Sequence, residues 1–193
     1  AEDIYTAEAA LALIEVEYEA LPMVLDPHEA LKPGAPQVHA DCPNNVAFEM
    51  DHPFNTGDVD KAFAEAYAVA EFAGVNSRQK HLHLETDIAI ASFESDGRLV
   101  IHSPSQGPHL AKKHLTKRVF PDLDDGDIRW ISPAIGGGFG ARLALGVEPV
   151  AVLLARACRR PVRVTTTREE DFQGYSSRTD QHQKIRVAAD KEG

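Results

Sequence analysis

The sequence predicts an α+β fold, in which mixed sheets are packed against helices. Segments of alternating apolar residues, typical of strands, are interspersed with segments whose apolar residues have helical spacing. The 193 residues are 43% hydrophobic and 26% charged, which is close to an ordinary globular domain. No apolar run approaches the roughly 18–20 residues that a membrane span requires. We therefore expect a protein without a transmembrane helix.

The charge and the cysteine count exclude several kinds of protein. Thirty acidic residues against twenty basic ones give a net charge of −10, which disfavours binding to nucleic acid. Cys42 and Cys158 are too few for a disulfide scaffold or a cysteine-rich metal site. We expect a cytoplasmic protein with small-molecule or protein partners.

The two ends of the chain suggest a piece of a longer polypeptide. Residues 7–14 have helical spacing and residues 14–18 then alternate as a strand does, with Ala1 rather than Met in first place. Near the other end, residues 185–189 alternate and stop at a turn, so the hairpin partner of this strand is expected to be missing. A compact domain with a processed N-terminus is the alternative.

The first half of the chain contains one long connector and a hairpin. Residues 21–45 are rich in proline and predict a linker, and NVAFEMD after them is strand-like. Asp58 is a fair N-cap for a helix that buries Val59, Ala62 and Phe63. Residues 88–92 and 99–101 alternate around a turn at 96–97 and predict a β-hairpin, with Ile88, Ile90 and Ser92 set against Leu99 and Ile101.

The second half alternates helices and strands. A helix is expected from Pro108 to Pro121, then a strand over DIRWISPAI, then a helix over residues 147–158. An apolar stripe marks the buried face of that helix and makes a core thiol of Cys158; its members are Val147, Val150, Ala151, Leu154 and Cys158. PVRVTTT predicts a strand, and Thr167 with Glu170 predicts a capping box.

The strongest local feature is a glycine loop, residues 135–142 (IGGGFGAR), between a strand and a helix. Bare backbone can adopt positive φ and approach a ligand closely, and its N–H groups favour an anion. The pattern Gly136-x-Gly138-x-x-Ala141 also satisfies a degenerate dinucleotide fingerprint, with Glu169 as the acid to test. The polar, alternating strand DIRWI before the loop disfavours that interpretation. A tight structural turn is the simplest alternative.

Two further groups of residues could carry chemistry. On a strand, His81, His83 and Glu85 would share one face, with a spacing that can ligate zinc or iron, although a polar strand face is the commoner explanation. Gln106 lies in SPSQGPH, between a strand and a helix, where its amide could donate a hydrogen bond into a cleft. No Gly-x-Ser-x-Gly motif for a nucleophilic serine is present.

Taken together, these segments resemble the molybdenum-cofactor-binding subunit of the xanthine dehydrogenase and aldehyde oxidase family. Five segments carry the resemblance, in the family's order: IEVEYEALPMVLDPHEAL, RQKHLHLETDIAIA, SPSQGPH, AIGGGFGAR and PVRVTTTREEDF. The resemblance implies that residues 1–20 are the tail of an α/β-hammerhead-like domain and that residues 21–45 are a linker. Residues 46–193 would be the first, incomplete part of the cofactor-binding domain of a larger molybdenum hydroxylase subunit.

The resemblance also assigns roles. Gln106 would hydrogen-bond an oxo ligand of molybdenum, while Gly137, Gly138, Phe139 and Gly140 would lie against the metal and the pterin. Gln106 and Phe139 would be near molybdenum without ligating it, because the pterin sulfurs hold the metal. His81 and His83 would then be scaffold residues.

The implied chemistry is water-dependent oxidation of an aldehyde or of an N-heterocyclic or aromatic carbon, with electrons leaving through iron–sulfur clusters and FAD on partner subunits or domains. The family's catalytic glutamate is not in this sequence, so the chain alone should be inert. Where purine oxidisers place an acidic residue in the substrate pocket, this chain has Leu143, and Arg142 before it resembles members acting on aromatic thioesters. A dinucleotide-dependent oxidoreductase and a non-catalytic assembly subunit are the alternatives.

Overall fold

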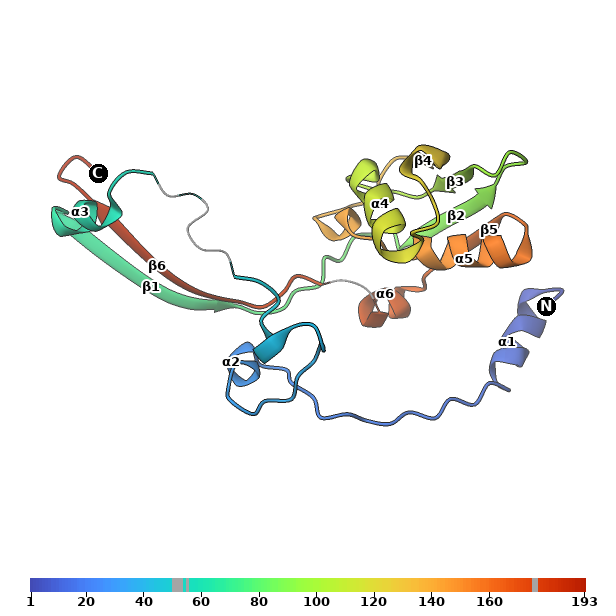
Figure 1. The fold of residues 1–193 in the computed structure, drawn as a ribbon, viewed down its shortest axis with the longest axis horizontal. Helices are drawn as coiled ribbons and strands as arrows, with labels where there is room; N and C mark the ends of the chain where they lie inside the picture. Colours follow the sequence, from blue (N-terminus) through green and yellow to red (C-terminus); the bar gives the residue numbers. More distant parts are fainter. Residues whose placement is uncertain (50–53, 55, 175–176) are drawn as a thin grey trace. The chain divides into compact units, whose positions relative to one another are not determined.

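The computed structural model describes residues 1–49, 54, 56–174 and 177–193. The chain divides into two compact units, Ala1–Lys61 and Ala62–Gly193. Figure 1 shows the elements of both units, and each unit is described by itself. Helices and sheets of mixed direction are both present, which confirms the α+β class.

Helix α1, Ile4–Leu11, opens the first unit and is capped by Asp3, whose Oδ1 accepts a hydrogen bond of 2.7 Å from the N–H of Thr6. The strand predicted over residues 14–18 is wrong: the segment forms no strand, and Ile14, Val16 and Tyr18 are exposed. Apolar alternation stabilises a strand only where a neighbour supplies the ladder hydrogen bonds, and the described residues supply none here.

The proline-rich segment is irregular apart from two short helical turns. Helix α2, Pro27–Ala30, is followed by the 3₁₀ turn η1, Pro43–Asn45. The Asn45 side chain organises the loop between them, since Nδ2 donates to the carbonyls of Ala30 and Pro36 and Oδ1 accepts from the N–H of Val38. Residues 46–49 form no strand, and most of the remaining predicted strand lies outside the described residues.

Helix α3, Val59–Ala64, forms where it was predicted, and Asp58 Oδ1 accepts a 3.0 Å hydrogen bond from the N–H of Lys61. Its predicted burial is wrong, because Val59 and Ala62 are exposed and Phe63 is only half-buried. The local signal for the cap was correct, whereas burial depends on what packs against the helix.

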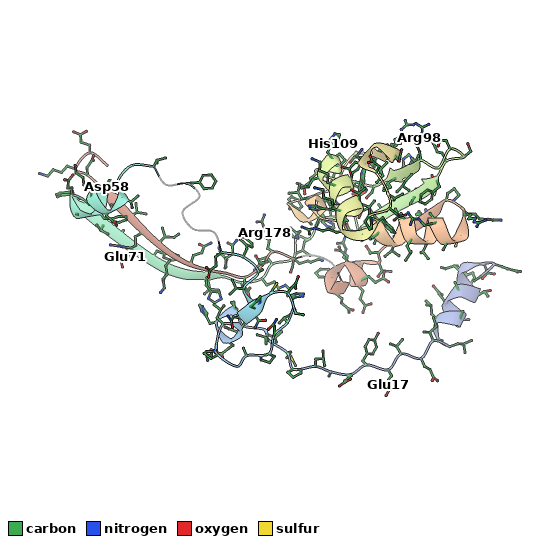
Figure 2. The ribbon with its side chains drawn as sticks, viewed as in Figure 1. Glu17, Asp58, Glu71, Arg98, His109 and Arg178 are labelled. Carbon is green, nitrogen blue, oxygen red and sulfur yellow. The ribbon has the colours of Figure 1, made fainter. Side chains whose placement is uncertain are left out.

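A two-stranded antiparallel ribbon pairs β1, Ala68–Asn76, with β6, Gln181–Ala189. The predicted absence of a partner for the C-terminal strand is therefore wrong: its partner lies far upstream instead of in a following hairpin. Directly opposed residues share a face of the ribbon. One face carries Phe72 opposite Ile185, and the other carries the ion pair between Arg186 and Glu71, a residue labelled in Figure 2.

A four-stranded sheet has the order β4-β3-β2-β5. Its strands are β2 Ile88–Phe93, β3 Leu99–His102, β4 Ile128–Ile131 and β5 Val162–Thr165, and only β3 and β4 are parallel. The predicted hairpin is confirmed as β2–β3, but its inner face is different. Ala91 lies opposite Ile101, and Phe93 opposite Leu99, while Ile90 is exposed.

Helices pack on this sheet around one core. Helix α4, Pro108–His114, continues as a π-type segment η2, Leu115–Val119, and the short 3₁₀ turn η3, Asp125–Asp127, leads into β4. Helix α5, Glu148–Cys158, packs against β2 and β5, and helix α6, Arg168–Gly174, follows β5. The centre of the core consists of fully buried residues: Ala89, Ala91, Leu99, Ile101, Leu115, Ala151 and Val152.

The buried face of α5 differs from the predicted stripe. Ala151, Val152 and Ala155 are buried, whereas Val150 and Leu154 are exposed. Cys158 is exposed as well, so the core-thiol prediction is wrong. The wide apolar surface of this helix left its inner face undetermined by spacing alone, and the small alanine residues are those that fit closely against the sheet.

In the part of the chain that the structure describes, no helix has the length and apolar character needed to cross a membrane.

Candidate functional site

The glycine loop connects β4 to the 3₁₀ turn η4, Ala141–Leu143, and α5 begins only at Glu148. The loop thus does not open directly into a helix, which removes the helix N-terminus that a dinucleotide fingerprint relies on. Three of its residues have left-handed φ values: Gly137 at 107°, Phe139 at 50° and Gly140 at 94°. Such a conformation is uncommon for phenylalanine and is characteristic of functional loops.

Gln106 lies in contact with the glycine loop. The Oε1 atom of Gln106 accepts a 2.9 Å hydrogen bond from the N–H of Gly140, and the backbone N–H of Gln106 donates to the carbonyl of Arg142 at 3.0 Å. Because the amide oxygen is held by the loop, the NH₂ group is the part of this side chain available to a ligand.

The first three glycines of the loop have no room for side chains. A Cβ on Gly138 would lie 2.5 Å from Cδ of Gln106, and one on Gly137 would lie 2.8 Å from Cβ of His83. A Cβ on Gly136 would meet Glu85. A simple turn does not require this many glycines. Here they allow the loop backbone to lie directly against Gln106 and residues 83–85.

The loop presents a row of hydrogen-bond donors. The N–H of Gly136 donates to Glu85 Oε2 at 3.0 Å, and those of Gly140 and Ala141 donate to Gln106 and to the Gly138 carbonyl. Within the described residues, the N–H groups of the three positions between them, 137–139, have no hydrogen-bond partner. Successive free N–H groups are suited to a ligand that offers acceptor atoms.

Phe139 and Leu143 provide apolar surface beside these donors. The Phe139 side chain is 61% exposed, although phenylalanine is among the residues most often buried. Leu143 is 42% exposed, and its Cδ2 lies 3.3 Å from the position of a Cβ on Gly107, next to Gln106. Both side chains remain accessible to a ligand.

Arg142 has a role that the sequence did not reveal. It is only 5% exposed, and its guanidinium hydrogen-bonds the carbonyls of Gly137, Glu85 and Thr86. It also forms ion pairs with Glu85 and Asp87, at 3.3 and 3.6 Å. A buried cation surrounded by carbonyls is structural support for the loop and leaves no free group for a substrate.

Arg178 was not singled out from the sequence either. This residue, labelled in Figure 2, lies between α6 and β6, where it forms a bridge with Gln79. Its Nη2 donates to the carbonyl of Phe139 at 3.3 Å. A lone arginine in an exposed segment has no sequence pattern that would have predicted this contact.

Two carboxyl groups near the loop, the half-buried Asp87 and the buried Glu148, have raised pKa values. Burial raises the pKa of Asp87, and the nearby Arg142 guanidinium offsets part of that rise. Burial also raises the pKa of Glu148, which accepts hydrogen bonds from the Ser103 hydroxyl at 2.7 Å and the Gly146 N–H at 2.6 Å. These two hydrogen bonds offset part of the rise in the Glu148 pKa. Asp87 and Glu148 both belong to the scaffold of the site.

The metal-ligand interpretation of residues 81–85 gains no support. These residues do not form the predicted strand, and the buried His83 ring places Nδ1 against the carbonyl oxygen of Glu85. No group of three histidine, cysteine or acidic side chains able to hold a metal occurs among the described residues.

The arrangement fits a cofactor with hydrogen-bond acceptors on a flat edge. Three free N–H groups can donate to such a ligand, the Gln106 amide can donate a further bond, and the bare backbone at Gly138 permits close approach. Such a site can bind and orient a ligand through neutral donors.

Comparison with known proteins agrees with this geometry. Residues 38–193 match the family described as "Molybdopterin cofactor-binding domain". The chain is 34% identical over 187 residues to a xanthine dehydrogenase subunit, named as probable, of Bacillus subtilis, covering 97% of this chain and 24% of the relative. It is 28% identical over 186 residues to the "Nicotinate dehydrogenase large molybdopterin subunit" of Eubacterium barkeri, covering 96% of this chain and 42% of the relative.

Solved structures give the same result. The aldehyde oxidoreductase of Desulfovibrio gigas matches with a TM-score of 0.80 and 27% identity, over 100% of this chain and 21% of that one. The quinoline 2-oxidoreductase of Pseudomonas putida matches with a TM-score of 0.78 and 29% identity, over 98% of this chain and 24% of that one.

The chain therefore belongs to the molybdopterin cofactor-binding domain family, which confirms the resemblance found in the sequence. It spans between about a fifth and two fifths of the length of these relatives.

Proposed function

We propose that this chain binds and orients the molybdopterin cofactor in the large subunit of a molybdenum hydroxylase of the xanthine dehydrogenase and aldehyde oxidase type. The observation that carries the proposal is the row of free N–H groups at residues 137–139, set beside a glutamine whose oxygen is fixed by Gly140. The donors are fixed before the cofactor binds, so little reorganisation is required.

Each site residue has a defined task in this proposal. Gln106 donates its NH₂ group to an oxygen of the bound centre, and Gly137 and Gly138 donate N–H groups and leave space. Phe139 covers one side with its ring and donates its own N–H, while Gly140 holds Gln106. When bound, the cofactor supplies two-electron oxidation of a substrate carbon, with oxygen taken from water.

The substrate class proposed is an aldehyde or an N-heterocyclic or aromatic carbon. The relatives named for aldehyde, nicotinate and quinoline support this class. Leu143 contributes an uncharged wall near Gln106, which offers no carboxylate to a purine ring. No catalytic residue is proposed within this chain, and we expect it to be inert alone.

The proposed partners are the remainder of the same large subunit, an iron–sulfur subunit and an FAD subunit, in a cytoplasmic complex that binds no nucleic acid. The name of the Eubacterium barkeri relative, which contains "large molybdopterin subunit", supports an assembly of several subunits. The dinucleotide alternative receives less support, since Glu169 lies on α6 with its Oε1 bonded to Gln173.

The proposal is tested by measuring molybdenum and pterin in the native complex that contains this chain. We expect near-stoichiometric molybdenum by mass spectrometry and a pterin fluorescence signal after oxidation. A bound nucleotide without molybdenum would overturn the proposal in favour of the dinucleotide alternative. A complex that contains neither molybdenum nor a nucleotide would also overturn the proposal and would favour a non-catalytic assembly subunit.

A glycine substitution tests the site itself. In Gly138→Ala the new methyl group would displace the Gln106 amide, so we expect a clear fall in molybdenum per complex. Gly174→Ala is the matched control, because no atom of the described residues lies within 4 Å of its added Cβ and its φ is not left-handed. Equal molybdenum contents in the two variants would contradict the placement of the cofactor against Gly138.

A further inference from the structure

We propose that Arg142 is a positioning residue, which fixes the peptide planes of the glycine loop and thereby aims the free N–H groups at the cofactor. The inference rests on the proposed function and adds a residue that contacts no ligand itself. Its guanidinium is buried and is held between the loop and residues 85–87.

The contact that matters is the one with Gly137. Nε of Arg142 donates to the Gly137 carbonyl at 3.0 Å. In a trans peptide unit the C=O of one residue and the N–H of the next point in opposite directions. A Gly137 carbonyl held towards Arg142 therefore directs the Gly138 N–H away from Arg142, towards the side where that N–H has no protein partner.

The same guanidinium is anchored from the opposite side. Nη2 donates to the carbonyls of Glu85 at 2.9 Å and Thr86 at 3.2 Å. Glu85 Oε2 lies 3.3 Å from Nη2 and also accepts the N–H of Gly136 at 3.0 Å, while Asp87 pairs with Nη1. Arg142 is thus fixed by residues 85–87 and transmits that position to the loop.

The backbone of Arg142 adds a second link. Its carbonyl accepts hydrogen bonds from the Gln106 N–H at 3.0 Å and from the Ser105 hydroxyl at 3.3 Å. Arg142 therefore connects the Gln106 segment to the glycine loop through its main chain and connects the loop to residues 85–87 through its side chain. A group that only neutralised Asp87 would need none of the carbonyl bonds.

The test compares three variants of the native complex. Arg142→Met removes every guanidinium contact, and Arg142→Lys retains the charge and donors able to reach some of the carbonyls. Lys112→Met is the control: this half-buried cation also donates to two backbone carbonyls, of Asp125 and Ile128, but lies on α4 outside the site. The readouts are the melting temperature, the rate of molybdenum loss on dialysis and the Mo(V) electron paramagnetic resonance spectrum.

We expect Arg142→Met to lose molybdenum about tenfold faster and to change the g-values, the scale seen when a supporting partner of a metal centre is removed. Lysine should restore most of both properties, and Lys112→Met should lower the melting temperature without changing either. In Arg142→Met the Asp87 carboxylate loses its cationic partner, and the complex then fails to accumulate if that charge is not tolerated. In that case the double variant Asp87→Asn/Arg142→Met, which also removes the carboxylate, takes the place of Arg142→Met in the comparison.

The outcomes separate the two proposals. A wild-type complex without molybdenum overturns the proposed function, and this inference with it. A molybdenum-containing wild type overturns the inference alone if the Arg142 variant that accumulates retains the wild-type spectrum and rate. The inference is also overturned if Lys112→Met changes them equally, since Arg142 would then act only through stability.

Discussion

Gln106 is positioned from two directions, by the Gly140 N–H at its side-chain oxygen and by the Arg142 carbonyl at its backbone N–H. Neither contact requires a charged partner for the amide, so the side chain retains a neutral donor at any physiological pH. The nearby groups with shifted pKa values are instead the half-buried Asp87 and the buried Glu148. At the scale of single residues, pH therefore acts on the scaffold and not directly on the proposed ligand contacts.

The effect of pH on the scaffold can be measured through the buried carboxyl group of Glu148. Because burial raises its pKa, the folded protein holds the proton more tightly than the unfolded chain does. Its contribution to the free energy of unfolding is thus greatest at acidic pH and falls as the pH rises from the ordinary glutamate pKa through the folded one. We expect the melting temperature of Glu148→Gln to depend less steeply on pH between 4 and 8 than that of the wild type.

Glu170→Gln serves as the control, because the pKa of Glu170 is shifted in the opposite direction to that of Glu148. The Thr167 backbone N–H and the Thr167 hydroxyl lower the pKa of Glu170, so its contribution is lost as the pH falls through the folded pKa. Parallel pH profiles for Glu148→Gln and wild type would contradict the account of the buried carboxyl group.

The elements show which sequence signals are sufficient. The β2–β3 hairpin and the helix caps formed as predicted because their signals lie within a few residues: a turn at Asp96–Gly97 and capping side chains beside each helix start. The inner face of α5 was mispredicted because apolar residues surround most of that helix. The pairing of β1 with β6 was missed because no local pattern specifies a partner so distant.

The site was predictable to a similar degree. Gln106 and the glycine loop were found because the bare backbone and the neighbouring amide have a distinctive pattern. The resemblance linked Arg142 to the substrate, and Arg178 was not singled out, whereas both side chains donate to carbonyls of the glycine loop. Their function depends on which carbonyl groups the fold brings within reach, which spacing does not determine.

The capping box of α6 allows a prediction at the scale of one element. Thr167 Oγ1 accepts the Glu170 N–H at 3.1 Å, and Glu170 Oε2 accepts the Thr167 N–H at 2.7 Å. We expect Thr167→Ala to lower the free energy of unfolding by about 1 kcal/mol, measured by urea denaturation. Thr167→Ser keeps the hydroxyl and should lose much less. Equal losses in the two variants would show that the methyl group, and not the cap, stabilises the helix.

At the scale of the whole molecule, apolar surface remains uncovered within this chain. Val150, Leu153 and Leu154 are exposed on α5, and Phe72 with Ile185 is exposed on one face of the ribbon. Patches of this kind mark sites of contact with other protein surfaces. This is consistent with the chain spanning a minor share of its relatives' length.

We accordingly expect the isolated chain to bind the dye ANS strongly. Replacing Leu153 and Leu154 with Lys should reduce ANS fluorescence without weakening the helix, because leucine and lysine have similar helix propensities. Ala155→Lys is the control on the buried face and should unfold the sheet region instead. Unchanged ANS fluorescence in the double variant would mean that this face of α5 is not the dye-binding surface.

The ribbon also determines an order of events during synthesis. Asn76 at the end of β1 pairs with Gln181 at the start of β6, so β1 leaves the ribosome about 100 residues before its partner begins. At roughly 5–20 residues per second, this interval is about 5 to 20 seconds. The β2–β3 hairpin is complete early in that interval, whereas β1 must remain unpaired throughout it. The nascent strand, with Phe72 at its centre, therefore exposes an unpaired edge until β6 has been synthesised.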